Sequence, residues 1–223
     1  MTFSDPAKIS GYADYAMKMV PGLRDLHQMI GVLLAERVPE NAHILILGAG
    51  GGMELKAFAE AYRDWQFDGI DPSHAMLELA RATLDELNFR VRLTQGLIHD
   101  APLELFDGTT CLLTLHFLKQ PERLDTLKEL YLRLKPGAPL VIAHHSFSTE
   151  GSEPDKWLKR NAAYAIMSGM PKDLAQQNIP AIRERLPVLS PQQDVELLEK
   201  AGFVDIELFY SAFTFKGWVA YKP

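Results

Sequence analysis

An apolar run that ends at a cluster of glycines is the feature that most constrains this chain. Residues 44–47 read Ile-Leu-Ile-Leu, and the segment 48–52 reads Gly-Ala-Gly-Gly-Gly. A run that is apolar at every position suits a strand covered on both faces, as in a parallel sheet. Apolar residues then recur at the helical spacings of three and four: Leu55, Phe58, Ala59 and Tyr62. The pattern predicts a buried strand, a tight turn and a helix.

The alternation of strand and helix continues along the chain. Further strands are predicted at residues 67–70, 90–94, 110–115 and 140–143. Helices are predicted to begin at Pro72-Ser73 and to cover residues 122–134. Strands that alternate with helices at this spacing indicate right-handed βαβ units. We therefore expect an α/β fold with a doubly wound, mostly parallel sheet.

After residue 146 the pattern changes. Residues 147–190 predict helical segments broken at Pro154, Gly169-Met170-Pro171, Pro180 and Pro187. A helix is predicted to begin at Ser190-Pro191 and to end at Gly202. Two strand-like stretches follow, 203–210 and 212–221, and they are close enough for an antiparallel hairpin. The hairpin brings the expected sheet to seven strands.

The 223 residues show no internal repeat and no linker, so a single domain is expected. Its parts are an N-terminal helical cover at 1–40, a cofactor-binding core at 41–146, a helical lid at 147–190, and a helix with the closing hairpin at 191–223. Within the cover, the aromatic and Met-rich stretch 12–20 is expected to lie over the cofactor.

Charge and cysteine content limit the partners and the setting. The 23 Lys and Arg against 29 Asp and Glu give a net charge of −6, which disfavours passive binding to phosphate backbones. The lone Cys111 excludes an internal disulfide and a Cys-rich zinc site. Residues 1–6 lack the features of a signal peptide, and no apolar run approaches the roughly 20 residues that cross a bilayer. A cytoplasmic protein with no membrane contact is expected.

The glycine cluster and an acidic residue after the second strand point to a nucleoside cofactor. Gly48 and Gly50 match the first two places of the dinucleotide pattern G-x-G-x-x-G, but Met53 holds the third. The chain reads G-x-G-x-G instead, which weakens a nicotinamide-dependent oxidoreductase as an alternative. Asp71 can accept hydrogen bonds from two vicinal ribose hydroxyls. A glycine turn after the first strand and an acid after the second fit S-adenosylmethionine (SAM) well.

Three segments, 44–52, 69–76 and 134–140, resemble class I SAM-dependent methyltransferases. The resemblance implies a Rossmann-like fold whose last strand runs antiparallel, with SAM as cofactor. It also implies a set of cofactor contacts. The methionine end would lie on Gly48, Ala49 and Gly50, the ribose on Asp71, and the adenine between Pro72 and Met76 with Leu97 and Ile98 at its edge.

A closer likeness is to carboxy-SAM synthases, which serve tRNA wobble-uridine modification. The segments that carry it are 20–23, 29–37, 200–203, 207–210 and 213–215. It covers most of residues 20–221 and is weakest in the middle of the lid.

Several polar positions of these families are apolar here. Ile46 and Leu97 stand where the methyltransferases carry acids, and Leu23 and Leu112 where the synthases carry Tyr and Asn. Leu197 stands where the synthases carry the Arg that holds the extra carboxylate of the cofactor. An apolar side chain cannot compensate a buried carboxylate. The prediction is therefore a SAM-dependent methyltransferase acting on a small molecule. Carboxy-SAM synthesis, a tRNA-modifying activity and a non-catalytic SAM-binding relative are the alternatives.

Histidines that follow the predicted strands are the candidate proton acceptors for such a transfer. His116 follows the fourth strand and His144 the fifth, and they are the predicted catalytic residues. His99 and His145 are weaker candidates. A metal site on these histidines is not expected, because no carboxylate is close by in sequence. The lid offers apolar contacts to a substrate from Trp157, Tyr164, Met167 and Met170. The sequence leaves open whether the chain forms a homodimer.

Overall fold

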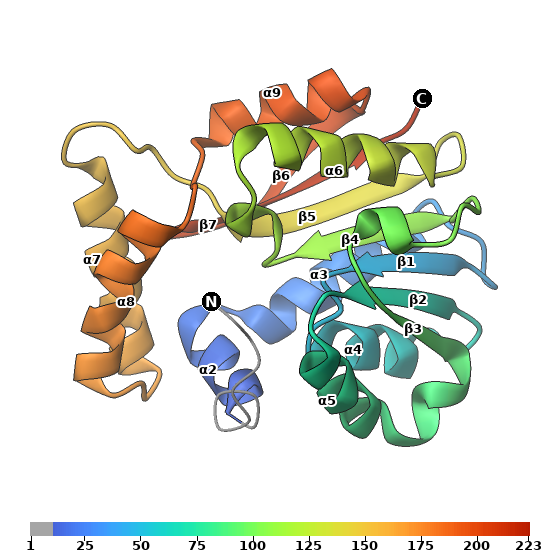
Figure 1. The fold of residues 1–223 in the computed structure, drawn as a ribbon, viewed down its shortest axis with the longest axis horizontal. Coiled ribbons are helices and arrows are strands. Elements are labelled where there is room, and N and C mark those ends of the chain that lie inside the picture. The colour runs from blue at the N-terminus through green and yellow to red at the C-terminus, as the bar shows by residue number, and fades with distance from the viewer. Residues whose placement is uncertain (1–10) are drawn as a thin grey trace.

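A seven-stranded sheet forms the centre of the computed structural model, which describes residues 11–223 (Figure 1). Its strand order is β3-β2-β1-β4-β5-β7-β6, and β7 runs antiparallel to both of its neighbours. The strands are β1 (His43–Leu47), β2 (Gln66–Asp71), β3 (Val91–Gln95), β4 (Gly108–Leu112), β5 (Pro139–His145), β6 (Val204–Ala212) and β7 (Phe215–Tyr221). The predicted doubly wound sheet with a C-terminal antiparallel hairpin is confirmed.

Helices cover both faces of the sheet (Figure 1). One face carries α3 (Leu23–Ala35), α4 (Met53–Ala61) and α5 (His74–Leu84), and the other carries α6 (Gln120–Leu132) and α9 (Pro191–Ala201). Beyond the carboxyl ends of the parallel strands lie α2 (Tyr12–Met19), α7 (Glu153–Met167) and α8 (Lys172–Arg185). Short 3-10 turns connect the rest: η1 (Asp85–Arg90), η2 (Ile98–Asp100) and η3 (Leu115–Phe117).

The apolar run of β1 divides between the two cores. Ile44 and Ile46 pack with the core under α3 and α4, whereas Leu45 and Leu47 pack with the core under α6 and α9. All four side chains are buried, which explains why every position of the run is apolar. Each contributes about 1.5–3 kcal/mol by leaving water. Burial on both faces therefore holds β1 in place, and with it the start of the turn that follows.

The strand boundaries differ from the predicted ones by one to three residues, and two of these differences affect the candidate histidines. The fourth strand ends at Leu112 rather than at residue 115, because Leu113 has a φ of +53° and turns the chain into η3. The fifth strand continues to His145. His144 and His145 therefore lie within β5, not after it, and successive strand residues point to opposite faces of the sheet.

The prolines of the lid do not all break helices. Pro154 lies in the first turn of α7, where its missing N–H would have had no helical partner. Pro180 lies inside α8, and the helix continues past it to Arg185. The prediction of a break at Pro180 is wrong. Ala175 and Ile182 anchor the helix on either side of the proline by packing into the core, which offsets the lost hydrogen bond.

Residues 1–10 of the predicted N-terminal cover lie outside the described residues. The prediction that residues 1–6 form no signal peptide falls on the same segment. Within residues 11–223, no helix is both long and apolar enough to cross a membrane.

Candidate functional site

The glycine turn between β1 and α4 has a backbone that other residues would strain. Gly48, Gly50 and Gly52 have φ values of +81°, +50° and +78°. A Cβ on Gly48 would lie 2.0 Å from the side-chain oxygen of Thr114, and a Cβ on Gly52 would lie 2.9 Å from the backbone of Ala80 in α5. Gly48 thus lets the end of β4 approach the turn, and Gly52 lets α4 and α5 pack closely.

Asp71, the last residue of β2, is bonded directly to this turn. Its Oδ2 accepts a hydrogen bond from the backbone N–H of Gly50 at 2.9 Å, and its Oδ1 accepts one from that of Ser73 at 2.8 Å. Burial raises the pKa of Asp71, and these two backbone hydrogen bonds act against that rise. The carboxylate is held in one orientation, and each oxygen keeps a further lone pair.

The residues expected around an adenine follow β2 and β3 at the same edge of the sheet. Asp71 pairs with Gln95 in the parallel ladder, so the segments after the two strands start side by side. Met76 and Ile98 are buried, whereas Pro72 is exposed and Leu97 is 58% exposed. The topology brings these segments together, and their contacts with a cofactor stay predictions.

A small cavity of about 30 Å³ lies between the glycine turn, the carboxyl end of β4 and the helices α2 and α3. Its lining residues come from five segments: Tyr12, Ala16, Leu23, His27, Gly48, Ala49, Gly50, Gly51, Met53, Glu54, Leu112 and Leu113. The ring of Tyr12 lies over the turn, because a Cβ on Gly51 would be 3.4 Å from it. Tyr12 of the stretch 12–20 thus lies over the turn, and the expected position of that stretch over a cofactor stays a prediction.

Glu54 is a residue of this cavity that the sequence reading overlooked. Its side chain is only 6% exposed, and its Oε1 accepts a hydrogen bond from the hydroxyl of Thr110 in β4. Burial raises the pKa of Glu54 to about 8. One signal was available, since Glu54 precedes Phe58 by four residues and so shares the apolar face of the helix.

Three of the candidate histidines, His116, His144 and His145, lie close together but do not line the cavity. The fourth, His99, is exposed, and its Nε2 lies 3.1 Å from Asp125. The ring nitrogen Nδ1 of His116 accepts a hydrogen bond from the backbone N–H of His145 at 3.3 Å. Nδ1 of His145 lies 3.0 Å from the hydroxyl of Thr214. Burial lowers the pKa of His145 to about 3 and that of His116 well below its ordinary value. Both rings are therefore neutral near pH 7, the form that accepts a proton.

His144 points to the opposite face of β5 and joins a buried ionic network. Its Nε2 lies 3.3 Å from Oδ1 of Asp194, and the guanidinium of Arg123 donates to the same carboxylate oxygen at 2.5 Å. All three side chains are almost fully buried. Leu197 of the same helix, α9, packs into the core beneath it and does not line the cavity.

The lid is tied to the N-terminal helix. The side-chain amide of Asn161 in α7 donates to the backbone carbonyl of Met19 at 3.3 Å, and α2 packs against α7. Met170 is buried and Trp157 half-buried, whereas Met167 is 89% exposed. Met167 therefore does not pack into the core, and its contact with a substrate stays a prediction.

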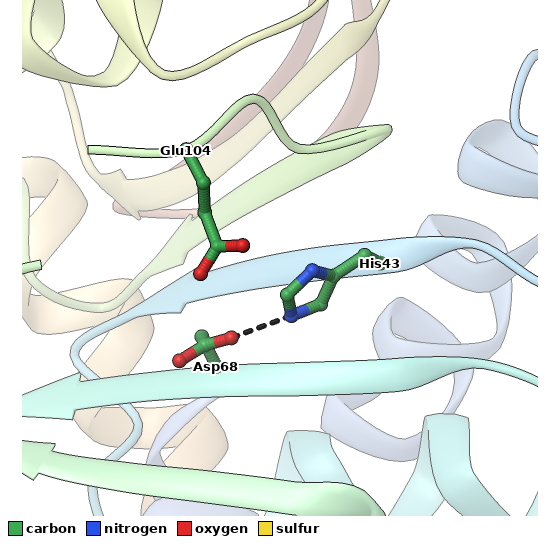
Figure 2. Close-up of side chains that lie close together, drawn as sticks. All are labelled: His43, Asp68 and Glu104. Atoms are coloured by element: carbon green, nitrogen blue, oxygen red, sulfur yellow. Dashed lines mark hydrogen bonds and ion pairs between the residues drawn. The ribbon is translucent and has the colours of Figure 1, made fainter. Parts of the chain in front are cut away.

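A second cluster of polar side chains lies at the opposite, amino-terminal end of the strands (Figure 2). His43, Asp68 and Glu104 place ligand atoms within 4.8 Å of one another, a spacing that a metal ion could bridge. However, the guanidinium of Arg92 donates hydrogen bonds to both carboxylates, and His43 lies 2.5 Å from Asp68. The cluster already contains a cation bonded to both acids, so we assign it no metal.

Known proteins are similar to this chain in sequence and in fold. Residues 44–137 match the model of a methyltransferase domain. The fold is shared with an O-methyltransferase family protein of Burkholderia thailandensis, at a TM-score of 0.67 and 14% identity over 98% of this chain. It is also shared with human N-acetylserotonin methyltransferase, solved in complex with SAM, at a TM-score of 0.60 and 14% identity over all of this chain. The chain spans 60% of the length of each of these two proteins.

The fold and the matched domain are those of the SAM-dependent methyltransferases, enzymes whose cofactor is SAM. Within that class the chain is similar to the carboxy-S-adenosyl-L-methionine synthase of Campylobacter jejuni subsp. jejuni. The two are 26% identical, over 98% of this chain and 93% of the synthase.

Proposed function

We propose that this chain transfers the methyl group of SAM to a small molecule. One observation carries the proposal: the hydrogen bond from the Gly50 N–H to the Asp71 carboxylate, which joins the glycine turn and the ribose-binding acid into one rigid unit. When bound, SAM supplies an electrophilic methyl group on a sulfonium. The chain then has to hold the cofactor and orient the acceptor, because positioning provides much of the rate of such a transfer.

The residues of the turn fit this cofactor. The positive φ values of Gly48 and Gly50 leave a backbone surface without Cβ atoms, on which Ala49 adds only a methyl group. Asp71 has lone pairs left for two ribose hydroxyls. We assign the methionine end to the turn, the ribose to Asp71, and the adenine to the segments that hold Pro72, Met76, Leu97 and Ile98.

Two observations favour a small acceptor over a nucleic acid. The cavity is closed by α2 and α3, and the lid of α7 and α8 stands beside them at the carboxyl ends of the strands (Figure 1). The net charge of the chain is −6, whereas nucleic-acid binding depends on Lys and Arg that displace counterions. Salt-sensitive binding of tRNA would favour the tRNA-modifying alternative.

We assign the proton acceptor to the histidine pair His116 and His144. His116 lies in η3, three residues after the cavity-lining Leu113, but burial lowers its pKa well below the ordinary value, and its Nδ1 would have to release the N–H of His145 before it could take a proton. His144 lies in the network with Arg123 and Asp194, which fixes its position. An acceptor that carries no proton on its nucleophile would need neither histidine.

Titration of the purified protein with SAM and with S-adenosylhomocysteine tests the proposed function. Both ligands should bind, and the variant Asp71→Asn should bind them about 10- to 100-fold more weakly, because a charged hydrogen-bond acceptor for the ribose is lost. The same substitution at the exposed Asp64 is the matched control and should change nothing. Absence of binding heat with both ligands would refute the proposal.

Carboxy-SAM synthesis is the second candidate, because the similarity to the Campylobacter synthase spans nearly the whole chain. The burial of Leu197 in the core argues against it, since that position offers no charge to an extra carboxylate. Binding of SAM without transfer to any acceptor would instead favour a non-catalytic relative.

A further inference from the structure

The charge of the cofactor cavity suggests which form of the cofactor it takes. The side chains that line it include one carboxyl, that of Glu54, and neither Lys nor Arg, as far as residues 11–223 are concerned. Asp71 lies next to it, at the N–H of Gly50, and adds a second carboxylate to the same region. A cavity of this composition favours a cation and disfavours a further anion.

The position of Glu54 is fixed from two sides. Its helix, α4, starts immediately after the glycine turn, and Gly52 allows this helix to pack closely on α5. The hydroxyl of Thr110 donates to one carboxyl oxygen, and Thr110 is paired in register with Ile46 of β1. The carboxyl therefore lies where β1, β4 and the turn converge, with one oxygen engaged by protein.

A buried carboxyl without a countercharge is costly when it is ionised. Burial raises the pKa of Glu54 to about 8, and the hydroxyl of Thr110 only partly opposes this effect. The other titratable groups around this region are Asp71 of β2, Tyr12 and Tyr15 of α2, and His27 of α3. Burial keeps Tyr12, Tyr15 and His27 neutral near pH 7, because it raises the pKa of Tyr12 to about 12 and that of Tyr15, and lowers that of His27 to about 4.

We propose that Glu54 is the carboxyl that meets the positive charge of the methionyl end of SAM, and that it makes the site select SAM over carboxy-SAM. This inference rests on the proposed function. The methionyl end of SAM carries a sulfonium and an ammonium group against a single carboxylate, so it is a net cation, and either positive group would pair with the carboxylate of Glu54. Carboxy-SAM adds a carboxylate beside the sulfonium, which Glu54 would repel and which no described lining residue would compensate.

Calorimetric titration of the full chain with SAM, carboxy-SAM and S-adenosylhomocysteine tests the inference. The unaltered protein should bind SAM at least about tenfold more tightly than carboxy-SAM. In two buffers of different ionisation heat near pH 7, SAM binding should release a proton, because the cation favours ionised Glu54. Affinity for SAM should therefore rise as the pH rises toward about 8.

The variant Glu54→Gln should weaken SAM binding by about 10- to 100-fold, abolish the proton release and narrow the preference over carboxy-SAM. The variant Glu60→Gln, on the exposed face of the same helix, is the matched control and should behave as the unaltered protein. S-adenosylhomocysteine lacks the sulfonium but keeps the ammonium. If Glu54→Gln weakens both ligands equally, the ammonium is the partner; if it weakens SAM more, the sulfonium is.

Equal affinity of the unaltered protein for SAM and carboxy-SAM would overturn the inference, and so would unchanged SAM binding in Glu54→Gln. These two outcomes leave the proposed function standing, whereas absence of binding of every ligand removes both. The ligand preference and the proton release are measured on the unaltered chain, so they decide the matter even if the Glu54 variant does not fold.

Discussion

Gly48 combines two constraints in one residue. Its φ of +81° is strained for any residue with a Cβ, and that Cβ would also lie 2.0 Å from the hydroxyl oxygen of Thr114. Gly137 has a similar φ of +77°, but nothing lies within 4 Å of its Cβ position. Comparing Gly48 with Gly137 therefore separates the energetic cost of a positive φ from the cost of the close approach to Thr114.

We expect Gly48→Ala to lower the free energy of unfolding by about 2–4 kcal/mol, of which strain at positive φ contributes about 1 kcal/mol and overpacking the remainder. Gly137→Ala should lower it by only about 1 kcal/mol. Urea denaturation of the two variants measures the difference. Equal losses would mean that Thr114 moves aside without cost.

The site residues that the sequence could predict are those whose role follows from local spacing. Gly48, Gly50 and Asp71 stand at the ends of recognisable strands, so their place at one edge of the sheet follows from the fold class. The buried carboxyl of Glu54 depends on Thr110, 56 positions further along the chain, and thus on the register between β1 and β4. Spacing within one segment carries no information on such a contact.

At the scale of elements, α2 controls access to the cavity. Its Tyr12 lies over the glycine turn, and the remaining space of about 30 Å³ is far below the roughly 300 Å³ or more that ligand sites provide. Asn161 ties the end of this helix to α7. We therefore expect a cofactor to enter only when α2 shifts, and the hydrogen bond from Asn161 would transmit that shift to α7.

Tyr12→Ala should raise the association rate constant for SAM by about threefold or more, because the closed state no longer excludes the ligand. Asp14→Ala, on the exposed face of the same helix, should leave the rate unchanged. Stopped-flow fluorescence follows both reactions. An unchanged rate for Tyr12→Ala would show that the cofactor enters by another route.

The sequence predicted the order and type of the elements well, because apolar periodicity and glycine or proline boundaries are strong local signals. It failed where a contact distant in the chain overrides local preference. Leu113 adopts a positive φ although leucine disfavours it, and Pro180 is accommodated inside α8 because that helix is anchored by its packing. The lid boundaries at 147 and 190 stay predictions.

At the scale of the whole molecule, the ionic network of Arg123, Asp194 and His144 connects α6, α9 and β5. Burial opposes ionisation of Asp194, but His144 and Arg123 outweigh it and lower the pKa of this carboxyl. The network links the helices of the second layer to the strand that borders the closing hairpin. It also fixes the position of one predicted proton acceptor.

Arg123→Ala should lower the free energy of unfolding by about 3–5 kcal/mol, because it leaves a buried carboxylate without its cation. Lys128→Ala, on the exposed side of the same helix, should change it by less than about 0.5 kcal/mol.

The stabilisation by this network should also depend on pH. Since the pKa of Asp194 is lowered in the folded state, its stabilisation is present above the unfolded pKa, about 3.9, and is lost as the pH falls below it. The difference between Arg123→Ala and the unaltered protein, followed by thermal unfolding, should shrink in acid. A constant difference would assign the loss to packing alone.

The position of β7 has a consequence for the order of assembly. This strand comes late in the chain, yet it lies between β5 and β6 and pairs with both. The five parallel strands with the glycine turn and Asp71 can associate through successive βαβ units, whereas β7 adds to the edge of β5 from the end of the chain. Until it docks, the buried face of β5 and its free edge stay open to other chains. Pairing of β7 therefore removes an edge at which β5 could add a strand from another chain.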